Sequence, residues 1–426
     1  MHRFFHIFIV FVIAFFGFID VAHAYLDPGT GSVLFSTIIA VVGAIAYSLK
    51  SLYYKLLGKK GSSGFEVGDD TLVIFSEGKS YWGTFRPLVE ELIKQKIHFR
   101  YISMELHDPA LTISSDYMHA RLYPKNKWSF EKLAKIKTPV MLATTPNIGS
   151  PDYPMVKSSR IGDLVHVFHA MSATSNYRLG GLDHYDSVIL VGPHQEDNLR
   201  TIEKIRGIPT KQMVALGLPY LDDLLTHRPN LPNQTSRRKT ILIAPSWGVK
   251  GCLNEYGTDF IRDLAKGDYN LIIRLHPHSK LYEPDNVARW KKKLAGLENL
   301  SWDNDVFAHN TMAASDLLIS DTSSIRFDYA FLYLKPVITL DIPRESREDF
   351  EAVYFETTWS ETSSNIIGTT LNRESIKELP HKVEHMLQRN LADEIRVFRD
   401  KTVSNFGCSA RHIISYVNKK VENAKC

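Results

Sequence analysis

Short apolar runs of strand length alternate with helical patterns along most of this 426-residue chain. Helical patterns such as Phe85–Gln95 and Glu196–Arg206 lie between the runs. Continuous apolar strands that alternate with helices predict parallel sheets covered by helices on both faces, the α/β class. The strand candidates are Thr71–Ser76, Phe99–Ser103, Pro139–Thr144, Leu164–His169, Val188–Gly192, Thr240–Ala244, Leu271–Leu275, Asp316–Ser320 and Pro336–Leu340.

The alternation is interrupted once, between Thr226 and Arg238, where prolines and polar residues dominate. We therefore expect two doubly wound, Rossmann-like domains that face each other across a cleft, over residues 71–228 and 239–372, followed by helices over 373–426. In such sheets ligands bind beyond the carboxyl ends of the strands, so the residues that follow each strand are the candidates for chemistry.

Two apolar runs precede these domains. Residues 1–24 are a signal peptide or a first membrane helix, and Ala22-His23-Ala24 is typical of a cleavage site. Residues 33–49 carry no charge and are long enough to span a bilayer, and residues 50–70 form a linker that begins with lysines. The positive-inside rule then places both domains on the cytoplasmic side of the cell membrane. The alternative for residues 33–49 is a buried helix of a soluble protein.

The composition excludes several classes of protein. A net charge of +4 and a pI near 8.7 give no nucleic-acid footprint. The three cysteines are widely spaced, which fits a reducing compartment and argues against a disulfide framework or a structural zinc site.

The strand candidate Asp316–Ser320 is followed by Asp321-Thr322-Ser323-Ser324 and then by a helical pattern. Hydroxyl groups and free backbone N–H groups at a helix N-terminus form an anion site, so this stretch predicts a phosphate-binding loop. Simple capping of the helix is the alternative, although one capping residue would suffice. Asp328, one turn further on, is either a ligand for a ribose or glycerol hydroxyl or an exposed first-turn carboxylate.

Three other strand ends carry candidate site residues. Ser246 and Trp247 follow Thr240–Ala244, where the ring could stack on a nucleobase or pack on the surface. Arg274 and His276 end the next candidate strand, and His276 could bind a phosphate or be structural. His169 ends Leu164–His169 and is the candidate general base.

Asp303-Asn304-Asp305 resembles a metal-binding DxD sequence, but it precedes a helical pattern over residues 306–314 and favours capping. No other carboxylate cluster has metal-ligand spacing. We therefore expect neither a metal nor a cofactor.

These strand ends, in this order, resemble the CDP-glycerol glycerophosphotransferase family, the teichoic-acid-type polymerases and primases. The resemblance covers roughly residues 164–341. Its pieces are Ile241–Trp247, Leu271–Pro277, Ser320–Asp328 with Leu334-Lys335-Pro336, and Gly217–Asp222. The histidine segment Phe168-His169-Ala170-Met171 departs from the Trp-His-Gly-Thr of the family, and Thr322 replaces its tyrosine.

The resemblance implies a GT-B fold and transfer of glycerol phosphate from CDP-glycerol to a hydroxyl acceptor with release of CMP. It implies that His169 is the base, that His276 lies at the donor pyrophosphate, and that Ser323 and Ser324 hold phosphate. The acceptor stays open among a lipid-linked sugar, a glycerol phosphate chain and a capsule repeat. The alternatives are a nucleotide-sugar glycosyltransferase or 2-epimerase, and a membrane-tethered binding module without activity.

Overall fold

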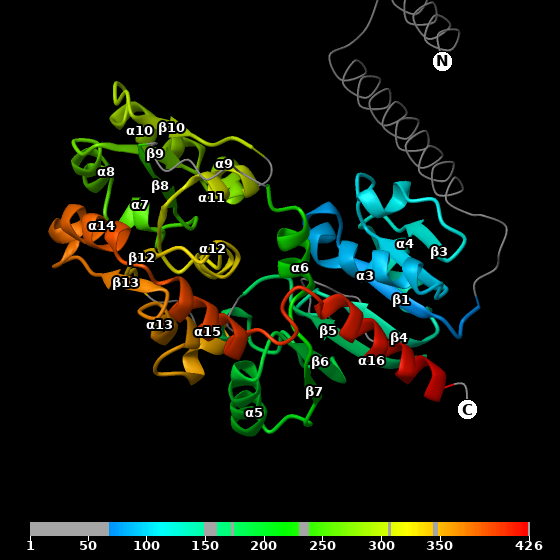
Figure 1. Ribbon diagram of the computed structural model, residues 1–426. Coiled ribbons are helices and arrows are strands. Elements are labelled where there is room, and N and C mark those ends of the chain that lie inside the picture. Colours follow the sequence, from blue (N-terminus) through cyan, green and yellow to red (C-terminus); the bar gives the residue numbers. More distant parts are fainter. Residues whose placement is uncertain are drawn as a thin grey trace, which may run out of the picture. The chain divides into compact units, whose positions relative to one another are not determined.

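The computed structural model describes residues 68–148, 160–171, 174–229, 238–305, 308–343 and 348–424 (Figure 1). The predicted signal peptide, the predicted membrane helix and all but the last residues of the predicted linker lie outside these ranges. Within these ranges, none of the helices has the length and apolar character that a bilayer crossing requires.

The first sheet has seven strands in the order β3-β2-β1-β4-β5-β6-β7, and every pairing is parallel. The central strands are almost wholly buried because helices cover both faces of the sheet. The strands are β1 (Leu72–Ser76), β2 (Phe99–Ser103), β3 (Met118–Leu122), β4 (Thr138–Ala143), β5 (Ile161–Val167), β6 (Ser187–Leu190) and β7 (Gln212–Ala215).

The second sheet has six parallel strands in the order β10-β9-β8-β11-β12-β13. Its two central strands, β8 and β11, end side by side, since Ser320 is the register partner of Ala244. The strands are β8 (Lys239–Ala244), β9 (Tyr269–Ile273), β10 (Leu300–Trp302), β11 (Leu317–Ser320), β12 (Val337–Leu340) and β13 (Gly368–Leu371).

The sequence predicted the inner strands of both sheets and missed β3, β7, β10 and β13. Each of these four is the outermost strand of its sheet. An edge strand is half-exposed and can be short and polar, as β10 with three residues and the exposed Arg121 of β3 are. Its sequence therefore lacks the continuous apolar run by which the inner strands were found.

Helices and short helical turns connect the strands in chain order. In the first half they are α3 (Trp82–Lys94), α4 (Lys127–Leu133), α5 (His194–Arg206) and α6 (Pro219–Thr226), with turns at η2 (Lys79–Tyr81), η3 (Pro109–Thr112) and η4 (Thr174–Asn176). In the second half they are α7 (Cys252–Glu255), α8 (Asp259–Leu264), α9 (Pro277–Tyr282), α10 (Pro284–Lys293), α11 (His309–Ala314), α12 (Ile325–Tyr333) and α13 (Trp359–Ser363), with turns at η5 (Glu351–Tyr354) and η6 (Ile376–Glu378). Three final helices follow: α14 (Leu379–Gln388), α15 (Ala392–Thr402) and α16 (Ser409–Asn423).

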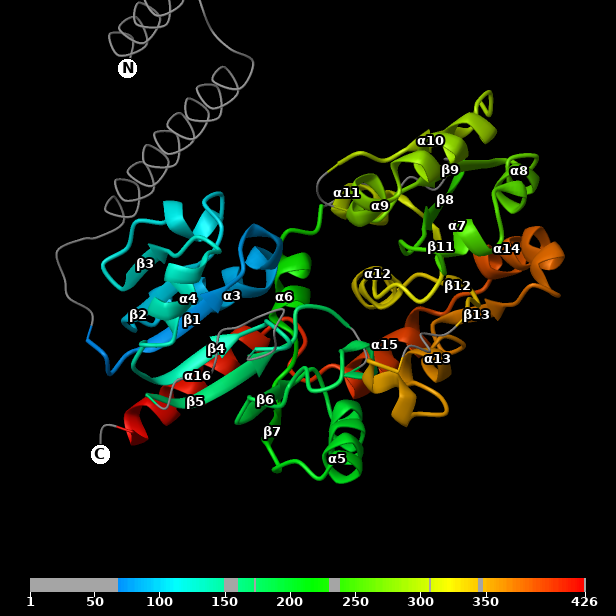
Figure 2. The same ribbon diagram turned by 180° about the vertical axis from the view of Figure 1, so that it is seen from behind.

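The last helix, α16, returns to the first sheet. Figures 1 and 2 show it beside β4 and β5, and its apolar face joins the core that contains Leu72, Val89 and Leu142. A polar contact fixes its start: the carboxylate of Asp222, on α6, accepts hydrogen bonds from the N–H of Gly407 (3.0 Å), the Ser409 hydroxyl (3.1 Å) and the N–H of Ala410 (3.0 Å). Asp222 thus caps a helix that lies far from it in sequence.

Gly217, at the start of the same segment, has a φ of +102°. A Cβ at this position would lie 2.1 Å from the backbone oxygen of Ser404. Only glycine combines this φ with so close an approach. The Gly217–Asp222 piece of the family resemblance therefore serves to dock the C-terminal helix.

We predict that Asp222→Ala lowers the free energy of unfolding by about 1–3 kcal/mol, because three donors lose their acceptor at a buried helix start. Urea unfolding followed by circular dichroism measures this change. Asp393→Ala is the matched control: its ion pair with Arg396 is largely in water, and its loss should cost less than about 0.5 kcal/mol. Equal losses in the two variants would contradict the capping role.

Candidate functional site

The carboxylate of Asp321 joins the two loops that follow β8 and β11. Asp321 is fully buried, and its oxygens accept hydrogen bonds from the backbone N–H groups of Ser246 (3.0 Å), Cys252 (2.9 Å) and Ser323 (3.2 Å). The carboxylate thus binds backbone N–H groups of the protein itself. Asp321 shapes the predicted phosphate loop, while the exposed side chain next to it is that of Thr322.

The N-terminus of α12 opens directly after this carboxylate. Ser324 is its N-cap residue, yet its hydroxyl makes no capping hydrogen bond. In the described part of the chain the hydroxyl of Ser323 is likewise not engaged by another group. The structure therefore does not support capping as the reason for these hydroxyls. The N–H groups of Arg326 and Phe327 already donate to the carbonyls of Ser323 and Ser324. The two half-buried hydroxyls and the N–H groups of Ser324 and Ile325 remain to receive an anion.

An aromatic cluster lies beside this loop. The Trp247 ring is 45% exposed and stacks on the His276 ring at a centroid distance of 6.3 Å. His278 and Tyr282, on α9, contact the same indole at 4.9 and 5.7 Å. An indole that is exposed can stack on a planar ligand. The candidate site residues of the sequence analysis include neither His278 nor Tyr282.

The geometry of His276 fixes where its proton resides. His276 is the N-cap residue of α9, and its Nδ1 accepts a hydrogen bond from the N–H of His278 (3.2 Å). Burial lowers the pKa of His276 to about 4, with a smaller contribution from His278. The ring is therefore neutral at pH 7 with its proton on Nε2, which makes Nε2 a donor for a phosphate oxygen.

A pocket of about 270 Å³ lies at this edge of the second sheet. Ser246, Trp247 and Thr322 of the predicted site line it, together with Thr358, Ser360 and Glu361 around α13. Asn176 of η4 lies at the same pocket. Next to Asn176, the chain of Arg178 forms an antiparallel bridge with Phe350, and the Glu351 carboxylate accepts from the N–H of Gly180 (2.9 Å). The loop after β5 and the segment before α13 thus complete the pocket together.

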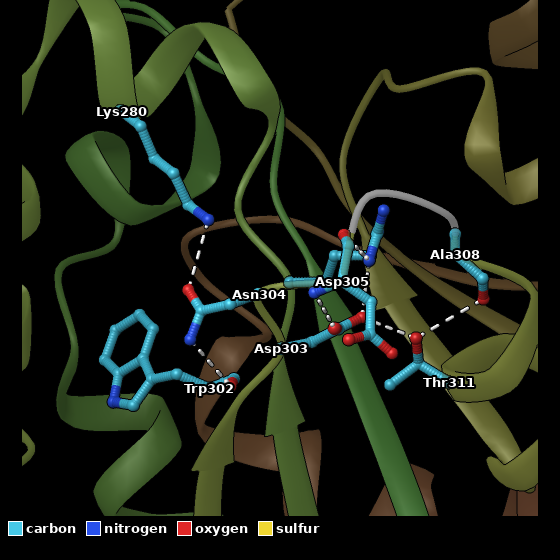
Figure 3. Close-up of polar contacts among 8 residues, drawn as sticks. Lys280, Trp302, Asp303, Asn304, Asp305, Ala308 and Thr311 are labelled. Atoms are coloured by element: carbon cyan, nitrogen blue, oxygen red, sulfur yellow. Dashed lines mark hydrogen bonds and ion pairs between the residues drawn. The ribbon is translucent and has the colours of Figure 1, made fainter.

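The Asp303-Asn304-Asp305 sequence is held by internal contacts (Figure 3). The Asp303 carboxylate pairs with Arg274 (2.5 Å) and accepts from the N–H of Asp305 (2.8 Å) and from the Thr311 hydroxyl. The expectation that these carboxylates cap a helix starting at residue 306 is wrong, because α11 begins at His309 with Ala308 as N-cap. Within the described ranges no group of three or more potential ligands could hold a metal ion.

These contacts also change the interpretation of Arg274, which the sequence analysis gave as a candidate substrate-binding residue. Its Nη1 donates to Asp303 and to the carbonyl of Asp305 (3.1 Å). The guanidinium therefore anchors the loop after β10. Any contact with substrate would be additional to this one.

His169 lies two residues after β5 and is half-buried. Its ring meets the Tyr81 ring edge-on at 5.2 Å, and burial lowers its pKa to about 4. His166, on the strand itself, is fully buried and its Nε2 lies 3.1 Å from the Tyr177 hydroxyl. Of the two imidazoles, His169 is the one nearer to solvent.

Glu77 follows β1 at the same edge of the first sheet as His169. Burial raises the pKa of Glu77, and its negative charge contributes to the raised pKa of Tyr81. Tyr81 is thus a neighbour of the candidate base, and the charge of Glu77 acts on Tyr81. The sequence analysis found neither residue, because no motif marks them.

Asp328 is buried rather than exposed, so its interpretation as a solvated first-turn carboxylate is wrong. Its Oδ1 has no hydrogen-bond partner in the described structure, and burial raises its pKa to about 7. Its charge is felt by Tyr220 of α6. A buried carboxyl with a free oxygen can take a hydroxyl donor, so a polyol contact remains the hypothesis.

The structure thus brings Ser246, Trp247, His276, Asp321, Thr322, Ser323 and Ser324 together around one loop pair. His169 has its described contacts with residues of the first sheet, and it does not line the pocket.

Comparison with known proteins identifies the family. Residues 165–419 match the family model described as CDP-Glycerol:Poly(glycerophosphate) glycerophosphotransferase. The match includes both halves of the site described above. The chain belongs to this family.

Among curated proteins, this chain is similar to the teichoic acid glycerol-phosphate primase of Bacillus spizizenii. The two are 25% identical over 252 residues, which are 55% of this chain and 59% of the primase. The chain thus spans less than two thirds of that curated relative.

Among solved structures, this chain is similar to the wall teichoic acid polymerase TagF, with a TM-score of 0.54 and 17% identity over 92% of this chain and 98% of that one. It is also similar to the UDP-GlcNAc 2-epimerase of Methanocaldococcus jannaschii, with a TM-score of 0.54 and 14% identity over 82% of this chain and 99% of that one. These likenesses show an α/β, GT-B-like fold.

The buried His166 predicts acid sensitivity of the fold. Burial lowers its pKa to about 3, so between pH 6.5 and 3 the unfolded chain binds a proton that the folded chain does not. The free energy of unfolding therefore falls with falling pH, by about 2 kcal/mol at pH 5 for this group. Urea unfolding at pH 7 and at pH 5 measures the difference.

His166→Phe should shrink that difference by about 2 kcal/mol, whatever its effect at pH 7. The control is His385→Phe, which changes an exposed imidazole on α14 and should leave the difference unchanged. If His166→Phe loses as much unfolding free energy between pH 7 and pH 5 as the wild type does, the attribution of this pH dependence to His166 is contradicted.

Proposed function

We propose that the chain transfers glycerol phosphate from CDP-glycerol to a hydroxyl acceptor of a cell-surface polymer or lipid-linked precursor, releasing CMP. The family match over residues 165–419 supports this reaction class. The observation that carries the proposal is the uncapped N-terminus of α12, where the hydroxyls of Ser323 and Ser324 stand without protein partners beside a neutral His276.

The donor diphosphate would lie at the start of α12. The N–H groups there and the Ser323 and Ser324 hydroxyls supply donors, and Nε2 of His276 supplies another. Ser246 and Thr322 face the adjoining pocket, and the exposed Trp247 ring offers a stacking surface for the nucleoside. Fixed donors of this kind stabilise the charge of a phosphoryl transition state without rearrangement.

The acceptor hydroxyl would reach the diphosphate from the side of the first sheet. Its oxygen forms a bond to the β-phosphorus in line with the bond that breaks, and CMP leaves with the bridging oxygen. His169 takes the hydroxyl proton. Its low pKa keeps the ring neutral at pH 7, which is the state that can accept a proton. The dianionic diphosphate would raise that pKa once bound.

We further propose that the apolar run over residues 33–49, alone or together with residues 1–24, tethers the protein to the cell membrane, with the catalytic part on the cytoplasmic side. The support is the sequence of the two apolar runs and the lysines that follow them. A tether would hold the active site near a lipid-linked acceptor.

The test of the reaction is incubation of the purified chain with CDP-glycerol and a hydroxyl acceptor, with detection of CMP. We expect CMP from CDP-glycerol and no nucleoside diphosphate from UDP-sugars. Release of UDP instead would favour a glycosyltransferase or epimerase. Binding of CDP-glycerol without CMP release from any acceptor would favour an inactive binding module.

His169→Ala should lower kcat by about 10²–10⁴-fold, because it removes a general base, and leave KM for CDP-glycerol within about threefold. Protonation of His169 should contribute no fall in kcat/KM between pH 7 and about 5, since the imidazole begins to be protonated only near its pKa of about 4. His381→Ala changes an exposed histidine of α14 and should keep full turnover. Near-normal turnover of His169→Ala would remove this residue as the base.

The full chain should sediment with membranes and resist a high-salt wash, whereas a chain that begins at residue 68 should not, because it lacks both apolar runs. Fractionation of cells that express each form measures this. Equal sedimentation of the two forms would contradict the proposed tether.

A further inference from the structure

Arg326 is a fully buried guanidinium directly behind the phosphate loop. It is the second residue of α12 and is 1% exposed. Its Nε donates to the carbonyl of Ser323 (3.1 Å). Its two terminal nitrogens donate to the hydroxyls of Thr339 (3.2 Å), Ser360 (2.7 Å) and Ser364 (2.6 Å).

All of these acceptors are neutral. Among the described residues no carboxylate lies within ion-pair distance of the guanidinium. Two carboxylates act on it from further away: Asp321, which already accepts three backbone N–H groups, and Glu361 at the start of α13. Burial lowers the pKa of Arg326 only to about 10, so the group is charged at pH 7. A buried cation without a direct counter-ion is costly, and an anion that arrives nearby relieves that cost.

The contacts of Arg326 place it where such an anion would bind. Ser323 belongs to the phosphate loop, and Ser360 lines the 270 Å³ pocket. One side chain therefore joins the loop after β11 to α13, whose start is fixed by a capping box between Thr358 and Glu361. The positive charge is buried away from water, where its field is weakly screened.

We propose that Arg326 is a positioning residue for the donor: it fixes the phosphate loop against α13, which lines the adjoining pocket, and it supplies the buried positive charge that the donor's diphosphate compensates. The inference rests on the proposed function. Arg326 does not touch the reacting atoms. It makes the pocket selective for a charged nucleotide over the corresponding nucleoside.

The experiment compares binding of CDP and of cytidine by calorimetry in the full chain and in Arg326→Met. CDP and cytidine share the nucleoside and differ in the diphosphate. Arg326→Met should weaken the affinity for CDP by about tenfold or more, and the affinity for cytidine by less than about twofold. Arg326→Lys, which keeps the charge, should retain most of the preference for CDP. Ser364→Ala removes one acceptor and keeps the charge, so its preference should equal that of the wild type.

A purely structural role would lower the stability of Arg326→Met and leave the CDP-to-cytidine ratio of the folded protein unchanged, and this result would overturn the proposal. If Arg326→Met does not fold, the same comparison of CDP and cytidine is made with Arg326→Gln, which replaces the cation by a polar side chain. A lowered preference for CDP would support the proposal, and an unchanged preference would overturn it. A wild-type chain that binds neither CDP nor CDP-glycerol would overturn the proposed function, and the inference with it.

Discussion

The structure of the candidate site depends on one buried carboxylate. Asp321 ends up between the loops of two adjacent central strands because β8 and β11 are register partners. Its oxygens accept backbone N–H groups from both loops, so the Ser246 loop and the start of α12 cannot move independently. The three N–H dipoles that point at the carboxylate offset part of its negative charge. Asp321 therefore holds the shape of the proposed anion site.

Charge at the site is arranged in layers. At the surface are neutral donors: the hydroxyls of Ser323 and Ser324 and the Nε2 proton of His276. Behind them lie the Asp321 carboxylate and the Arg326 guanidinium, which are held by different sets of neutral partners. The candidate base, His169, belongs to the first sheet and is kept neutral by burial. Such a division, with donors for the phosphate on one sheet and the proton acceptor on the other, suits transfer between two substrates that enter from different sides.

The sequence predicted what depends on local pattern. Inner strands are continuous apolar runs, and their ends carry the polar residues that gather at one edge of a parallel sheet, so Ser246, His276 and Ser324 were found together with the strands. Edge strands such as β10 have no such run. Where a polar loop precedes a helix, the helix begins later than the sequence predicted, as α11 does at His309. Contacts between distant segments were also beyond reach: nothing in the local sequence links Asp222 to α16, Arg274 to Asp303, or Arg326 to Ser360, because each pair meets only after the sheets form.

The central claim is that the diphosphate of CDP-glycerol binds at the start of α12, in front of Asp321 and Arg326. A crystal structure with CDP-glycerol bound tests it most directly. The account predicts phosphate oxygens about 3 Å from the hydroxyls of Ser323 and Ser324 and from Nε2 of His276. A diphosphate bound away from α12, with these three groups facing only solvent, would contradict it.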